Sequence, residues 1–141
     1  MTDGFAAAPR DLRRARVFDG LKEDGSPLVR RQDLTSVDEI MRIVGYLKAA
    51  PTVLLGRGLD KDAWSPAAEP AVPRSFSTDG TWIWSGGVTY YLQKYGMPPE
   101  PDLLAHIRAR NYTLPEVSAQ AQAAASSQLT GGAVAGPTAA G

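Results

Sequence analysis

The sequence predicts a small α+β domain, with a mainly antiparallel sheet of about four or five strands packed against about three helices. The clearest strand signal is Asp79-Gly80, which lies between the β-prone runs 76–78 and 81–84, a pattern typical of a tight hairpin. The clearest helix signal is at residues 36–49, where apolar residues recur at helical spacing. A chain of 141 residues has room for one such domain and one core, which we place at residues 10–115.

The N-terminal part is predicted to be a flexible leader at residues 1–9, followed by strands at 14–21 and 27–31. Asp24-Gly25 marks the turn between these strands. Seven basic and four acidic residues lie between residues 10 and 31, and they give this segment a net charge of +3. Such a segment is either an edge strand that resists pairing with other sheets or a surface for RNA or an acidic protein. No aromatic residues alternate with these arginines as a stacking platform, which favours the edge strand.

The middle of the chain begins with the helix at 36–49. Ser36 at the N-cap and Glu39 three residues later form a capping-box pattern, and Ala50-Pro51 ends the helix. The apolar run 52–57 is predicted to be an interior strand. Residues 58–73 contain three prolines and no periodic pattern, so we expect a long connection of the kind that is functional or flexible.

The C-terminal part is predicted to hold two more helices. Ser85 can cap a helix over 86–95, and Gly96 suits the position just after its end. A helix over 101–110 begins with a proline and an acid, as many helices do. Residues 116–141 are rich in Ala, Gly, Ser and Gln, a composition that predicts a disordered tail whose removal changes stability by less than about 0.5 kcal/mol.

Composition excludes several functional classes. Fifteen basic and fifteen acidic residues leave no net charge, so no overall field draws the protein to nucleic acid or to an anionic membrane. The absence of cysteine excludes disulfides, thiolate catalysis and cysteine zinc sites. No apolar run approaches the roughly 20 residues of a membrane span, and the N-terminus lacks the pattern of a secretory signal. We therefore expect a cytoplasmic protein that does not associate with a membrane.

Catalytic and cofactor motifs are not recognisable. The single histidine, His106, has Asp102 one helical turn before it, a spacing that also describes an ordinary surface pair. Asp79 precedes a glycine in a turn and needs no acid–base role to explain it. Gly56-Arg57-Gly58 lacks the rest of a phosphate loop, and Asp60 and Asp62 lack the glycine and glutamate of a calcium loop. We predict no catalytic residue, no metal and no cofactor.

Candidate contact residues for a protein partner come from the tryptophans and from the long connection. They are Trp64, Asp60, Asp62, Trp82 and Trp84. Trp64 either anchors an interface or folds back over the edge of the core. Trp82 and Trp84 share one face of a strand, so they either include an exposed anchor or both belong to the core, which would leave Trp64 and the loop around 60–62 as the contact.

Between residues 74 and 112 the sequence resembles small uncharacterised bacterial proteins of the actinobacterial type. The matching residues are Thr78, Asp79, Gly80, Trp82, Trp84, Tyr90, Tyr91, Leu92, Tyr95, Pro98, Leu103, His106 and Ile107. Some of these proteins are similar to immunity proteins that accompany secreted polymorphic toxins. The resemblance implies a non-enzymatic protein-binding module, an immunity or antitoxin-like inhibitor of a cognate toxin. The alternatives are a structural or accessory subunit of a phage- or secretion-type assembly and, third, RNA binding through the basic N-terminal segment.

Overall fold

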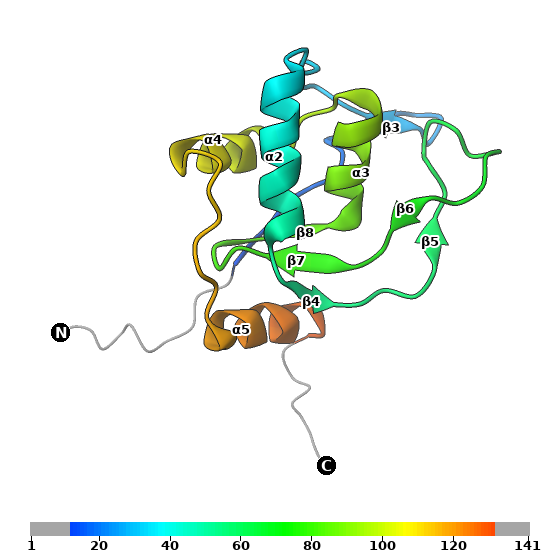
Figure 1. Ribbon diagram of the computed structural model, residues 1–141. Coiled ribbons are helices and arrows are strands. Elements are labelled where there is room, and N and C mark those ends of the chain that lie inside the picture. Colours follow the sequence, from blue (N-terminus) through cyan, green and yellow to red (C-terminus); the bar gives the residue numbers. More distant parts are fainter. Residues whose placement is uncertain (1–11, 132–141) are drawn as a thin grey trace.

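The computed structural model describes residues 12–131 and has the predicted α+β architecture. The main sheet has the strand order β1 (Arg13–Arg14), β8 (Trp82–Ser85), β7 (Phe76–Thr78), β4 (Thr52–Leu54). Its pairs are antiparallel except for β1 with β8, which is parallel. Helices α2 (Val37–Ala49), α3 (Gly86–Tyr95) and α4 (Pro101–Ala109) lie on one side of this sheet, and α5 (Ala119–Leu129) lies on the other (Figure 1).

The core lies between the sheet and the first three of these helices. Trp82 and Trp84 project from β8 toward the helices, each with 2 % of its surface exposed. Ile83, between them on the other face, is also buried, so β8 is covered on both sides. The helical part of this core consists of Ile43, Tyr46, Leu47, Val88, Leu92, Leu103, Leu104 and Ile107.

Local signals predicted the helix bounds well, although the Ser85 side chain, expected to cap α3, makes no capping hydrogen bond. At the start of α2 the Ser36 hydroxyl accepts a hydrogen bond from the amide of Glu39, as predicted. The Glu39 carboxylate accepts from Arg108 and Tyr112, so only this half of the predicted capping box forms. Gly96, just after α3, has a φ of 75°, and its amide donates to the carbonyl of Leu92. The hairpin turn is also confirmed: Gly80 has a φ of 95°, and Thr78 pairs with Ile83.

The predicted disorder of residues 116–141 is wrong for the part that the structure describes. Ser118 caps α5, and Ala125 of this helix is fully buried. The side chain of Gln128 both accepts from the amide of Leu12 (2.8 Å) and donates to its carbonyl (2.9 Å), so α5 also ties down the chain before β1. Alanine has the highest helix propensity and lets a helix approach closely, whereas the sequence argument counted only large apolar residues. Residues 132–141, like the predicted leader at 1–9, lie outside the described residues.

Three other predictions need correction. The strand expected at 14–21 is split: β1 joins the main sheet, and β2 (Gly20–Leu21) pairs with β3 (Pro27–Leu28) in a separate hairpin. The strand after α2 is β4, which lies at the edge of the sheet and not in its interior. The long connection is itself a hairpin, in which β5 (Leu59–Asp60) pairs with β6 (Val72–Pro73). We call residues 59–73 the β5–β6 arm.

Candidate functional site

Asp79 is the centre of a buried hydrogen-bond network, in addition to its predicted role in the turn. Its Oδ1 accepts from the amides of Thr81 (2.9 Å) and Trp82 (2.8 Å), which shapes the hairpin loop. Its Oδ2 accepts from the hydroxyl of Tyr46 on α2 (2.5 Å) and lies 3.0 Å from Nε2 of His106 on α4. The Asp79 side chain is fully buried, and its hydrogen bonds join two helices to the hairpin.

His106 therefore belongs to this network and not to a pair with Asp102, whose carboxylate accepts from Arg13 instead (2.8 Å). Nε2 of His106 is also 3.0 Å from Nε of Arg110. The contact that forms depends on the His106 tautomer. When the ring proton is on Nδ1, Nε2 accepts a hydrogen bond from Arg110, and when the proton is on Nε2, this atom donates to Asp79. Burial is the main cause that raises the pKa of Tyr46, and the Asp79 carboxylate raises it further. The hydroxyl therefore stays protonated and donates to Asp79.

Asp62, a predicted contact residue, is buried and holds the β5–β6 arm against α3. Its Oδ2 accepts from the hydroxyls of Tyr90 (2.7 Å) and Tyr95 (2.8 Å), and Nζ of Lys94 lies 3.4 Å away. Its Oδ1 accepts from the amide of Trp64 (2.8 Å). Burial acts to raise the pKa of Asp62, but these hydrogen bonds and the lysine outweigh it and lower the pKa to about 2. With 1 % of its surface exposed, Asp62 is not accessible to a partner.

Trp64 is one of the two predicted contact residues that the structure leaves accessible, with 40 % of its surface exposed. Its ring packs edge-on against Phe18, Tyr91 and Tyr95, with centroid separations of 5.4, 5.4 and 5.1 Å. One part of the indole is thus anchored while the rest faces solvent. Trp82 and Trp84 are both core residues. The sequence left open whether one of them is exposed, and in the structure neither is.

Many arginines of the basic N-terminal segment form contacts within the protein. Arg13 stacks on the Trp82 ring at 4.3 Å and pairs with Asp102. The side chain of Arg31 is only 3 % exposed and pairs with Asp19 at 3.1 Å. Guanidinium groups that already form these internal contacts are less available to bind RNA phosphates, which weakens the RNA-binding alternative.

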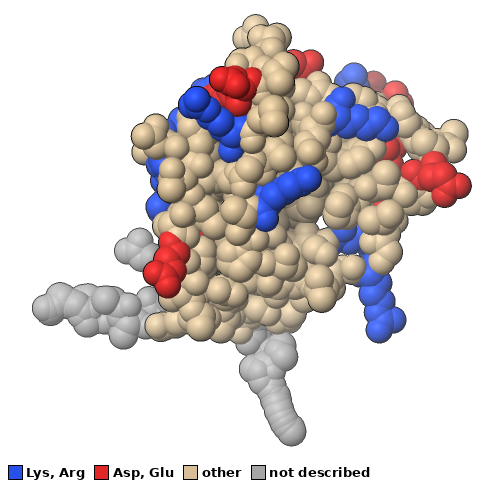
Figure 2. Space-filling model, viewed as in Figure 1, with Lys and Arg blue, Asp and Glu red and all other residues tan. Residues whose placement is uncertain are grey.

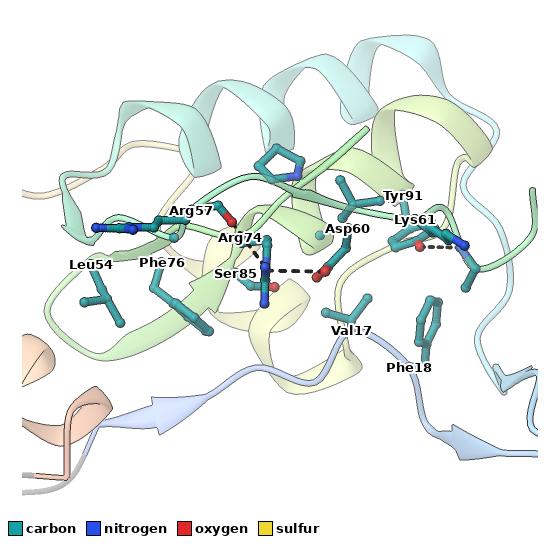
Figure 3. A pocket seen from close by; sticks show the side chains of 15 residues that line it. Val17, Phe18, Leu54, Arg57, Asp60, Lys61, Arg74, Phe76, Ser85 and Tyr91 are labelled. Atoms are coloured by element: carbon teal, nitrogen blue, oxygen red, sulfur yellow. Dashed lines mark hydrogen bonds and ion pairs between the residues drawn. The ribbon is translucent and has the colours of Figure 1, made fainter. Parts of the chain in front are cut away.

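A groove of about 930 Å³ lies between the β5–β6 arm, the start of α3 and the segment before β2. Figure 2 shows that the surface is hollowed between the arm and the rest of the molecule, with Lys and Arg side chains nearby. The residues that line it include Val17, Phe18, Arg57, Asp60, Lys61, Arg74, Phe76 and Ser85 (Figure 3). Sequence reasoning missed this groove because its walls come from separate segments, although Gly56 and Arg57 of the segment rejected as a phosphate loop line it.

Asp60, the remaining predicted contact residue, lies on β5 at the border of this groove. Its carboxylate pairs with Nε of Arg74 at 3.3 Å, and both side chains are more than half exposed. The structure thus places Asp60 and Trp64 on one arm, with accessible side chains, and removes Asp62, Trp82 and Trp84 from the accessible surface.

Comparisons with known proteins add no family: no family model, curated protein or solved structure matches the chain. In residues 12–131, none of the helices is long and apolar enough to cross a membrane. Over the same residues, no three side chains of His, Asp or Glu come together as a metal site would require. The accessible side chains of Asp60 and Trp64 make the β5–β6 arm and the groove beside it the candidate site.

Proposed function

We propose that this protein is a non-enzymatic, cytoplasmic binding module whose partner is another protein. The resemblance described above favours an immunity or antitoxin-like inhibitor that covers part of a cognate toxin. The observation on which the proposal rests is Trp64, an indole that is 40 % exposed on an arm held in place by buried contacts.

The surroundings of Trp64 suit a binding anchor. Tryptophan is enriched among the residues that dominate the binding energy of interfaces. Its edge-on contacts with Phe18, Tyr91 and Tyr95 hold the ring in one orientation, so little side-chain freedom is lost when a partner binds. Leu59 is 52 % exposed on the same arm and extends the apolar surface available to a partner.

The position of His106 supports a binding role over a catalytic one. The ring lies against the Asp79 carboxylate and the Arg110 side chain, and it joins α4 to the hairpin. A general base needs a reacting group within hydrogen-bond reach, and the partners of Nε2 here are two side chains of the fold.

The test is capture of partners from the native host by the wild-type protein and by three variants. Trp64→Ala removes the anchor and also the packing of the indole on its aromatic neighbours, so the folding of this variant is checked by circular dichroism and thermal melting. Trp64→Phe keeps a ring against the aromatic neighbours and loses most of the exposed indole. Met41→Ala, which changes an exposed apolar residue on α2, is the matched control.

We expect a specific partner that the wild type and Met41→Ala retain and that both Trp64 variants lose or bind weakly. For Trp64→Ala the loss should be about 2 kcal/mol or more, roughly a 30-fold rise in Kd. A toxin as the captured protein supports the inhibitor, whereas a component of a phage or secretion structure supports the assembly subunit. A partner held equally by folded Trp64→Ala and by the wild type would contradict the proposed surface.

A further inference from the structure

We infer that the groove beside the β5–β6 arm binds a small organic anion, with a phosphate-type group on a flat apolar body. This binding site adjoins the protein contact proposed at Trp64, because Phe18 and Tyr91 line the groove and also contact the indole, but the ligand and its binding residues go beyond that contact. The inference rests on the volume of the groove and on the two kinds of side chain that line it.

One part of the lining is basic. Arg57, Lys61 and Arg74 contribute three positive charges, and Asp60 is the one acidic residue that lines the groove. Asp60 pairs with Nε of Arg74, while Nη1 of Arg74 donates to the carbonyl of Arg57 (3.2 Å). The dashed lines from Arg74 to Asp60 and to Arg57 in Figure 3 mark these two contacts, which hold the guanidinium at the groove. A held guanidinium with further donors is well suited to an anion with several oxygens.

Arg57 and Lys61 differ from Arg74 because neither forms an ion pair with another residue in the described part of the chain. Both are exposed at the border of the groove. The groove therefore has a net charge of +2 even though the whole chain has none. A local excess of this kind raises the concentration of anions at the site.

The other part of the lining is apolar. Val17 and Phe18 come from the segment before β2, and Leu54 and Phe76 come from the end of the groove at β4 and β7 (Figure 3). A volume of about 930 Å³ is far larger than an inorganic phosphate needs and lies within the range of pockets for small organic ligands. Basic and apolar walls together thus favour a ligand with both parts over a free inorganic ion.

Two glycines lie where the walls of the groove come close together. A Cβ on Gly87, at the start of α3, would lie 3.4 Å from Val17 and 3.5 Å from Val72, so a larger side chain there would enter the space between the walls. A Cβ on Gly56 would collide with the carbonyl oxygen of Arg74, so this glycine permits the close approach that brings Arg74 to the groove.

The experiment is a titration of the full chain with phenyl phosphate, inorganic phosphate and phenol, followed by amide chemical shifts in NMR. Phenyl phosphate should bind saturably and at least tenfold more tightly than either of the other two. The largest shifts should fall on residues 56–61, 72–74 and 85–87. Lys61→Glu reverses a charge on an exposed side chain at the groove and should raise the Kd of phenyl phosphate at least tenfold. Lys22→Glu makes the same change in the β2–β3 turn, outside the groove, and should leave the Kd of phenyl phosphate unchanged.

Three results would each overturn the inference. The first is no saturable binding of phenyl phosphate. The second is binding of phenyl phosphate that is no tighter than that of inorganic phosphate. The third is an equal loss of phenyl phosphate affinity in Lys61→Glu and Lys22→Glu. None of these results bears on partner capture through Trp64, since that test uses other variants and another readout.

Discussion

Replacement of Asp62 by asparagine tests how the β5–β6 arm is held. The carboxylate accepts from two tyrosine hydroxyls and one amide, and Lys94 lies nearby. Hydrogen bonds to a charged group contribute about 1.5–3 kcal/mol each, but an asparagine retains one oxygen that can still accept. We therefore expect Asp62→Asn to destabilise the protein by about 2 kcal/mol at pH 7.

The pH dependence provides an independent value of this energy. The pKa of Asp62 falls from an ordinary 3.8 to about 2 in the folded protein. A lowered carboxyl pKa stabilises the fold at pH values above the unfolded pKa, and this stability is lost as the pH falls toward the folded pKa. The shift corresponds to about 2 kcal/mol at pH 7, of which roughly half remains at pH 3 and little at pH 2.

The assay is urea denaturation of the wild type and Asp62→Asn at several pH values between 3 and 7. The difference in unfolding free energy should shrink by about 1 kcal/mol between pH 7 and pH 3. Glu39, whose pKa is also about 2 because of Arg108 and Tyr112, titrates in both proteins and cancels in this difference. Asp60→Asn is the control, since this exposed carboxylate should change stability by less than about 0.5 kcal/mol. A difference that stays constant over this pH range would refute the reasoning.

Three further predictions concern stability, each measured by thermal or urea denaturation. Gly45→Ala should stabilise by up to about 1 kcal/mol, because Gly45 lies in α2 and its Cβ would meet no atom within 4 Å; a loss of stability would contradict this. Gly80→Val should destabilise by about 1–3 kcal/mol, because φ is 95°, and an unchanged melting temperature would show that the turn can take another form. Gln128→Ala should lower the free energy of unfolding by about 1 kcal/mol or more, because it removes two hydrogen bonds to Leu12. Gln120→Ala, at an exposed position of the same helix, should not change it measurably.

The parts of the fold that the sequence predicted are those determined by neighbouring residues. Ser36 and Glu39 lie in the same helical turn, and Gly96 directly follows the helix that it ends. Asp79-Gly80 specifies its own turn in the same way. Each of these signals acts over a few residues, so a single sequence contains it in full.

The parts that were missed depend on residues far apart in the chain. Asp62 is buried by Tyr90 and Tyr95, which follow 28 and 33 residues later, so its own neighbourhood suggested only an exposed loop. Gln128 meets Leu12 across 116 residues. The groove, likewise, is assembled from separate segments, and neither its volume nor its excess charge could be seen along the chain.

The most direct measurement of the central claim is ¹⁹F NMR of the protein labelled with fluorotryptophan, alone and with its captured partner. The chain has three tryptophans, of which Trp82 and Trp84 are 2 % exposed and Trp64 is 40 % exposed. The Trp64 resonance, assigned with Trp64→Phe, should be the one that shifts and loses its sensitivity to solvent when the partner binds, while the other two stay nearly constant. A complex that forms with the Trp64 resonance unchanged would contradict the claim that this arm is the binding surface.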